Sequence, residues 1–158
     1  MPGGWRSRRP SLIASSMAAI GEPGFEAIAV GSVSSPLTDL AAAPKQGDEG
    51  APEATIVFAD GFVAALEGIA AGDAVLVLTW LDRADRDVLH VHPRGDESRP
   101  ETGVFATRSP DRPNPIGLHR VEVVAIEGAT MTVRDLEAVD GTPVLDVKPV
   151  LGSAVGER

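Results

Sequence analysis

The sequence predicts a small, mostly β protein in which antiparallel strands form a barrel or a sandwich beside one short helix. Its 158 residues fit a single domain with one core, and they include 17 glycines and 13 prolines. This share of about 19% favours frequent turns and stays below the roughly 25–30% typical of disordered chains. Apolar and polar residues also alternate over short stretches, with turn-forming residues between them.

The two ends of the chain are set apart from this pattern. Residues 1–24 begin with several arginines and continue with a mildly apolar stretch that is short for an export or transit signal. We interpret them as a disordered tail or a mis-assigned start, with Met17 as the alternative start. Residues 153–158 form a second tail, so that the ordered domain is expected over 25–152.

Strands account for most of this domain. The stretch “FEAIAVGSV” (25–33) alternates and ends before a Ser-Pro pair, and a long polar loop (37–53) follows it. The run “DAVLVLTWL” is continuously apolar, which predicts a strand buried on both faces. Further strands are expected at 54–58, 73–81, 87–93, 103–107, 116–128, 131–136 and 143–150.

One segment has helical spacing. Asp60 is a suitable N-cap residue, and Phe62, Ala65, Leu66 and Ile69 follow at intervals that place them on one helical face. The sequence therefore predicts one short helix over 60–69.

Composition excludes several classes of site and partner. Cysteine is absent, which removes disulfides, thiolate metal sites and cysteine nucleophiles, and makes the cytoplasm the expected compartment. No apolar run approaches the roughly 18 residues of a membrane-spanning helix. The net charge is −9, and without the three arginines of the first sixteen residues the remainder carries −12. Such a surface repels phosphates, so an RNA partner needs a local basic patch, which we expect within the less acidic stretch 90–120.

The stretch “ATRSPDRPNPIGLHR” (106–120) is the most unusual of the chain. Ser109, Arg112 and Asn114 each precede a proline, which holds the backbone extended and removes amide donors. A segment of this kind forms a stiff loop outside the sheet. It is either a connection whose arginines pair with local acids or a preformed binding segment that presents Arg108, Arg112 and Asn114.

The segments “GVFATRSPDRPNPIGLHRVEV” and “DGTPVLDVKP” together resemble the TsaA-like (TrmO, YaeB) family. The resemblance extends over about 28–151 through four further segments: “AVGSVSSP”, “PKQG”, “ALEGI” and “LTWLDRADRDVLHVHPRGD”. Members of this family include S-adenosylmethionine-dependent methyltransferases that modify N6-threonylcarbamoyladenosine beside the tRNA anticodon. The resemblance implies a small β-barrel, a cytoplasmic homodimer with S-adenosylmethionine near the subunit interface, and the tRNA anticodon loop as partner. The absence of a Gly-rich dinucleotide loop agrees with a cofactor site unlike the Rossmann type.

The resemblance also implies which residues hold the cofactor. They come from three segments: Pro44, Lys45 and Gln46; then Arg108, Arg112, Pro113, Asn114, Pro115, Ile116 and Gly117; then Asp140, Gly141, Thr142 and Pro143. Asp146 and Lys148 on the last strand are further candidates, and His119 and Asp140 are candidates for a general base. Taken alone, the Asp-Gly pair of the third segment is also an ordinary hairpin turn.

Three positions depart from the family pattern. Lys45 stands where Arg is usual, His119 where Ser is usual, and Val150 where Tyr commonly follows “KP”. The C-terminal extension of larger members is not expected here. Other functions consistent with the sequence are therefore methyl transfer to a different RNA or small-molecule acceptor, and cofactor binding without catalysis.

A metal-dependent barrel enzyme is the remaining alternative. His90 and His92 occupy alternate positions of an expected strand, which is how a cupin-type metal site begins. No further ligand of suitable spacing follows, so we expect no metal.

Overall fold

The computed structural model describes residues 26–152, and both predicted tails, together with the alternative start at Met17, lie outside this range. The described residues divide into two compact units. Residues 27–83 and 116–152 make up one, which we call the barrel, and residues 84–115 make up the other, which we call the arm. Among the described residues, no helix has the length and apolar character needed to cross a membrane.

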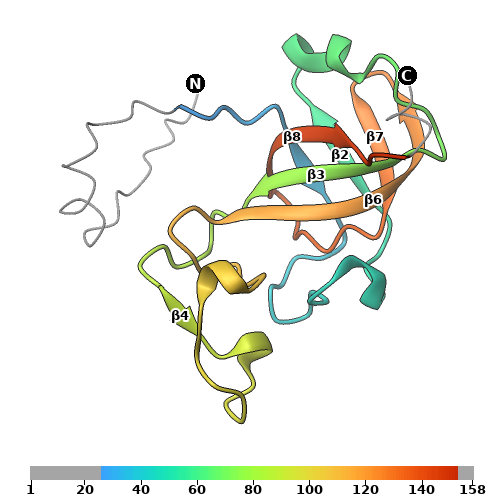
Figure 1. Ribbon diagram of the computed structural model, residues 1–158. Helices are drawn as coiled ribbons and strands as arrows, with labels where there is room; N and C mark the ends of the chain where they lie inside the picture. The colour runs from blue at the N-terminus through green and yellow to red at the C-terminus, as the bar shows by residue number, and fades with distance from the viewer. Residues whose placement is uncertain (1–25, 153–158) are drawn as a thin grey trace. The chain divides into compact units, whose positions relative to one another are not determined.

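The barrel is closed by six antiparallel strands in the order β1-β2-β7-β6-β3-β8, which confirms the predicted fold class (Figure 1). These strands are β1 (Gly31–Ser34), β2 (Ala54–Phe58), β3 (Ala74–Trp80), β6 (Ile116–Glu127), β7 (Thr130–Arg134) and β8 (Pro143–Pro149). Buried and less buried residues alternate along β2, β3 and the first half of β6, because one face of each strand lines the core.

Most expected strands are found within a residue or two of their predicted bounds, but four expectations need correction, of which the one for 87–93 is described with the arm below. The first strand begins at Gly31 instead of residue 25. β3 is buried on one face only, since its outward residues are half-exposed. The stretch 103–107 is mostly a 3-10 turn, η4 (Val104–Ala106).

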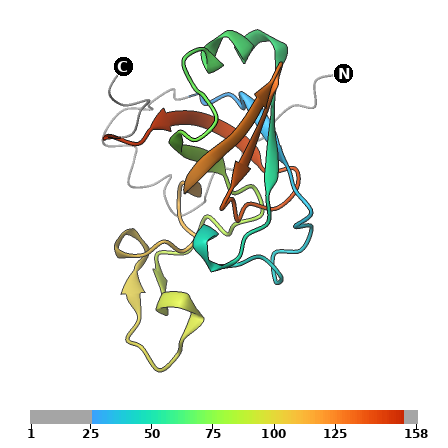
Figure 2. The same ribbon diagram turned by 90° about the vertical axis from the view of Figure 1, so that its right-hand side faces the viewer.

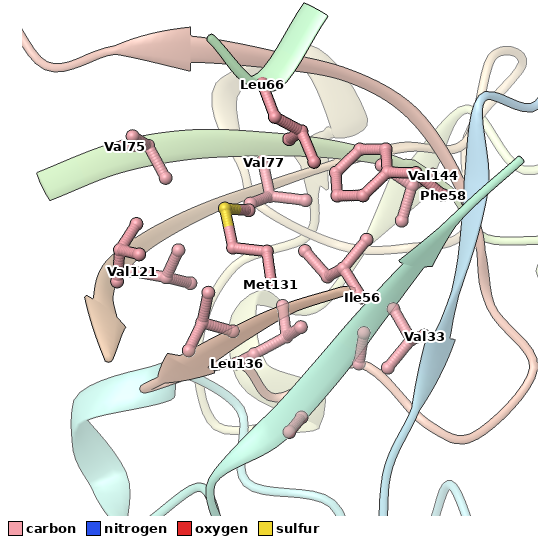
Figure 3. Packing of buried hydrophobic residues seen from close by; sticks show 14 residues of the cluster. Val33, Ile56, Phe58, Leu66, Val75, Val77, Val121, Met131, Leu136 and Val144 are labelled. Carbon is pink, nitrogen blue, oxygen red and sulfur yellow. The ribbon is translucent and has the colours of Figure 1, made fainter. Parts of the chain in front are cut away.

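Apolar side chains from all six strands fill the interior (Figure 3). Ile56, Val77, Met131 and Val144 are fully buried there. Each such side chain contributes about 1.5–3 kcal/mol to stability. Every residue of this core cluster belongs to the barrel.

The strand register gives the barrel two distinct ends. Ser34 pairs with Thr55, Ala54 with Val133, and Trp80 with Ile116. The β1–β2 and β7–β8 connections therefore leave the barrel at the same end, where β3 also finishes and β6 begins. We call this the loop end; η2 (Asp60–Leu66) and the β6–β7 turn lie at the opposite end (Figure 2).

The predicted helix is present as η2, a 3-10 helix that buries Leu66 against the core. Its N-cap is Ala59 and makes no side-chain cap bond, so the assignment of Asp60 as the cap was wrong by one residue. The helix ends three residues early because Gly68 adopts a positive φ of 94° just beyond it.

The arm contains a two-stranded sheet of β4 (His90–Val91) and β5 (Thr102–Gly103). It also contains η3 (Pro93–Gly95) and η4. The expected strand 87–93 is reduced to β4, since Pro93 begins η3 directly after it. In the connecting turn, hydrogen bonds donated by the hydroxyl and amide of Ser98 lower the pKa of Asp96.

Candidate functional site

The barrel brings several predicted cofactor residues to its loop end. Pro44, Lys45 and Gln46 directly precede η1 (Gly47–Glu49) in the β1–β2 connection. Ile116 and Gly117 open β6. The turn 140–143 ends the β7–β8 connection and enters β8. Residues far apart in the sequence are thus gathered on one side of the barrel by strand order alone.

The turn that contains Asp140 is fixed to the end of β1 by backbone and side-chain hydrogen bonds. The amide of Asp140 donates to the Leu37 carbonyl at 2.7 Å, and that of Gly141 donates to the Val33 carbonyl at 2.8 Å. The Asp140 carboxylate accepts from the Ser35 amide at 3.0 Å. Gly141 has a φ of 80°, which favours glycine there. The turn is therefore rigid, and one carboxylate oxygen of Asp140 is engaged in holding it.

The segment of Pro44, Lys45 and Gln46 is anchored through the next residue, Gly47. A Cβ atom on Gly47 would overlap the carbonyl oxygen of Asp135 and lie 3.1 Å from Oε2 of Glu137. The β1–β2 connection can approach the β7–β8 connection this closely only because residue 47 has no side chain.

A buried hydrogen-bond chain lies beneath these two connections. His119 on β6 is 5% exposed, and its Nε2 lies 2.8 Å from the hydroxyl of the fully buried Thr79 on β3. Its Nδ1 donates to Oε1 of Glu137 at 2.7 Å. Both ring nitrogens of His119, a candidate base, are thus occupied within the protein.

Gly117 makes room for this chain. Gly117 and His119 face the same side of β6, and Gly117 pairs with Thr79 across the β3–β6 register. A Cβ atom on Gly117 would overlap the Thr79 hydroxyl and lie 2.6 Å from Nε2 of His119. The “IGLH” sequence therefore supplies both the imidazole and the space that it needs.

Sequence reasoning did not single out Thr79 or Glu137. Thr79 carried a signal, since it is a hydroxyl at an inward position of an otherwise apolar strand. Glu137 carried none, because it precedes a turn in which acidic residues are common.

Asp146 and Lys148 lie on β8 and pair with each other at 2.8 Å, with both side chains largely exposed. Lys148 also borders a shallow cavity of about 280 Å³ formed with Glu67 and Ile69. This cavity is next to the end of η2 and so belongs to the end of the barrel opposite the loop end.

In the arm, Arg112 binds backbone of its own loop. Its Nε donates to the Ser109 carbonyl at 2.7 Å, and its Nη2 donates to the carbonyls of Val104 at 2.9 Å and Thr107 at 2.5 Å. The proline loop is therefore braced by an arginine as well as stiffened by its prolines. The partners of Arg112 are carbonyls, whereas the interpretation of this loop as a simple connection expected its arginines to pair with acids.

A second brace comes from the start of the arm. The amide of Asp85 donates to the Asp111 carboxylate at 2.8 Å, and Nε of Arg86 donates to the Pro113 carbonyl at 2.8 Å. Pro113 and Pro115 are buried. The exposed polar side chains of the loop are those of Arg108 and Asn114, and Arg108 forms no hydrogen bond or ion pair with any described residue.

The two histidines of the metal alternative belong to the arm instead of the barrel. His90 is exposed, and Nδ1 of His92 lies 2.8 Å from the carbonyl of Arg99. The described residues contain no group of three or more side chains placed to bind a metal ion. The structure thus offers nothing that supports a cupin-type site.

The chain is similar to several known proteins. A “Probable S-adenosyl-L-methionine-binding protein” of Archaeoglobus fulgidus is 45% identical over 120 residues, which cover 76% of this chain and 32% of the relative. An “S-adenosyl-L-methionine-binding protein” of the same organism is 43% identical over 119 residues, covering 75% and 84%. The crystal structure of TrmO from Pseudomonas aeruginosa superposes with a TM-score of 0.67 at 30% identity, covering 81% of this chain.

These matches cover most of this chain but a smaller share of some of the relatives. The chain spans about a third of the longer Archaeoglobus relative and 56% of the Pseudomonas structure. The model of the tRNA-methyltransferase O N-terminal domain matches residues 32–154, which include the arm and all of the barrel except residues 27–31. By this match, and by its likeness to relatives above 40% identity, the chain belongs to the family of the tRNA-methyltransferase O N-terminal domain.

Proposed function

We propose that this protein is an S-adenosylmethionine-dependent methyltransferase that methylates N6 of threonylcarbamoyladenosine in tRNA. The observation that carries the proposal is the family match, which extends over the entire loop end and the proline loop. The names of two Archaeoglobus relatives support the cofactor, and the name of the family supports the tRNA substrate.

The residues at the loop end suit this cofactor. Carboxylates and backbone carbonyls can accept hydrogen bonds from ribose hydroxyls and from the ammonium group, and arginines can bind the methionine carboxylate. Gly47 and Gly117 keep backbone and side chains close together without intervening Cβ atoms. We propose that the segments 44–46, 108–117 and 140–143 bind the cofactor, which supplies the methyl group as a sulfonium.

Catalysis in this proposal depends mainly on positioning. A methyl group passes from the sulfonium to N6 when the nitrogen lies in line with the carbon–sulfur bond, and holding that geometry lowers the barrier by itself. Of the two candidate bases, His119 is buried and Asp140 is exposed with one oxygen accepting from Ser35. Asp140 is therefore the better placed to meet a substrate proton.

The arm is the proposed place of contact with RNA. Arg94, Arg99 and Arg108 have exposed side chains there, whereas the protein as a whole carries a net charge of −9. Loops of RNA are suited to such contacts because their bases are partly unstacked. The proposed location is the cytoplasm, where the proposed tRNA substrate is available.

We also propose that two copies associate through the outer face of β3 and β6. Ile116 is 45% exposed and Leu118 is 42% exposed, and across the register they adjoin the half-buried Trp80 and Leu78. An apolar strip on a strand face is typical of a homodimer interface.

Two measurements test the function. Isothermal titration calorimetry with S-adenosylmethionine should give saturable binding, and no heat at millimolar cofactor would exclude this enzyme class. tRNA from a deletion strain should lack the methylated form of threonylcarbamoyladenosine, as measured by nucleoside mass spectrometry. If that nucleoside persists, tRNA is not the substrate.

A second candidate is cofactor binding with another acceptor or none. The Archaeoglobus relatives are named only for binding S-adenosylmethionine, and the acidic surface of this chain is unfavourable for RNA over most of its area. Binding in calorimetry together with unchanged tRNA nucleosides would favour this candidate.

A further inference from the structure

The side chain of Glu137 stands out at the loop end because only one of its oxygens is engaged. Oε1 accepts a hydrogen bond from Nδ1 of His119 at 2.7 Å. Oε2 makes no hydrogen bond or ion pair with any described residue. The side chain is 18% exposed, so that this second oxygen remains open to a ligand.

Two buried side chains, Thr79 and His119, fix the orientation of this carboxylate. Thr79 is fully buried and holds Nε2 of His119, while His119 holds Oε1 of Glu137. Gly117 has no Cβ atom, and the space that a Cβ atom would fill is taken by the Thr79 hydroxyl and the His119 ring. Proteins usually orient a ligand-binding side chain in this way, by fixing its rotamer with buried hydrogen bonds.

The neighbours of Glu137 place it within the proposed cofactor site. A Cβ atom on Gly47, next to Gln46, would come within 3.1 Å of Oε2, so the backbone at Gly47 lies close to this oxygen. The turn that begins at Asp140 follows three residues later in the same connection. Oε2 therefore lies beside the backbone that follows Gln46, and Glu137 shares a connection with the turn at Asp140. These are two of the three segments that the family resemblance assigns to the cofactor.

We infer that Glu137 binds S-adenosylmethionine, with Oε2 accepting hydrogen bonds from donor groups of the cofactor. Two parts of the cofactor offer such donors: the ribose hydroxyls and the α-ammonium group. Thr79 and His119 act as positioning residues that hold the carboxylate. This inference rests on the proposed function, since it deepens the description of the same site.

Calorimetry on Glu137→Gln tests the contact. The amide keeps the shape of the side chain and an acceptor for His119, but it removes the negative charge, so affinity for S-adenosylmethionine should fall about tenfold or more. Glu122→Gln is the matched control, since Glu122 is an exposed carboxylate of β6 paired with Arg134. This variant should bind S-adenosylmethionine with the affinity of the wild type.

The ligand 5′-methylthioadenosine, which has the ribose but no amino-acid group, identifies the part of the cofactor involved. If the ribose is bound, Glu137→Gln weakens both ligands; if the ammonium is bound, it weakens S-adenosylmethionine alone. Unchanged affinity for both ligands overturns the inference. Failure of the wild-type protein to bind S-adenosylmethionine would instead refute the proposed function, so the two failures are distinguishable.

A pair of variants at Thr79 tests the positioning role without touching the carboxylate. Thr79→Val keeps the shape but removes the hydroxyl, and it should weaken cofactor binding about threefold when affinity is measured at a temperature at which the variant is fully folded. Thr79→Ser restores the hydroxyl and should restore the affinity. Equal affinity in both variants would show that the chain from Thr79 to Glu137 serves stability alone.

Discussion

At the scale of single residues, Gly117 and Gly61 show that packing requires glycine at some positions of this chain and not at others. A Cβ atom on Gly117 would meet two buried polar side chains that are already hydrogen-bonded to each other. A Cβ atom on Gly61 would meet nothing within 4 Å. The first glycine is required by packing and the second is not.

We expect Gly117→Ala to destabilise the protein by about 1–3 kcal/mol, the usual cost of overpacking. The new methyl group must displace Thr79 or His119 and break their hydrogen bond. Denaturant unfolding measures the change, and Gly61→Ala, on the exposed side of η2, should stay within about 0.5 kcal/mol of wild type. Equal stability of the two variants would contradict the packing seen at Gly117.

Single residues also mark the limit of what the sequence predicts. The position of His119 at the site was predicted by family resemblance, but its two partners come from β3 and from the β7–β8 connection. Nothing in the local sequence pairs residues 40 positions apart. Which residues face each other across two strands depends on the strand register. The register of β3 and β6 cannot be read from the local sequence of either strand.

At the scale of elements, the strands were predicted well and the arm was not. β2, β3, β6 and β8 have clear alternation or continuous apolar runs, and the structure has them close to the predicted bounds. The arm has two short strands, a positive φ at Arg94 and two 3-10 turns. Its conformation depends on hydrogen bonds from side chains to carbonyls, which hydrophobic periodicity does not report.

Arg112 is the clearest case, and replacing it tests the loop as an element. Arg112→Lys keeps the charge but loses the planar group that reaches three carbonyls at once. We expect the loop to loosen and affinity for S-adenosylmethionine to fall about tenfold, which corresponds to about 1.4 kcal/mol.

Calorimetry and thermal unfolding together check this expectation. The thermal midpoint should change little, because no residue of the core cluster lies in the arm. Arg99→Lys is the control, since Arg99 forms an exposed ion pair with Asp96, and it should bind the cofactor as wild type does. Unaltered binding by Arg112→Lys would mean that the brace is dispensable for the site.

At the scale of the whole molecule, association of two copies is the property that the barrel surface predicts. Leu118 lies in the apolar strip of β3 and β6, whereas Val57 lies on β2 with the same 42% exposure. A charge placed within an apolar interface costs far more than a charge on an open surface.

Leu118→Lys should therefore convert the proposed dimer to a monomer, and Val57→Lys should leave the dimer intact. Sedimentation or light scattering at micromolar concentration measures the mass of each variant. A monomeric wild-type protein at 100-fold higher concentration would show that this strip has another role.

The insertion of the arm between two neighbouring strands also has a consequence for how this protein can change. Trp80 and Ile116 are paired partners in the β3–β6 register, so the chain leaves the barrel and returns to it at adjacent points. A long excursion between fixed points adds little closure entropy, about 0.6 kcal/mol for each doubling of its length. The residues between these strands can therefore be lengthened, shortened or exchanged at small cost to the barrel, which makes the arm the natural place for evolution or engineering to alter what the protein recognises.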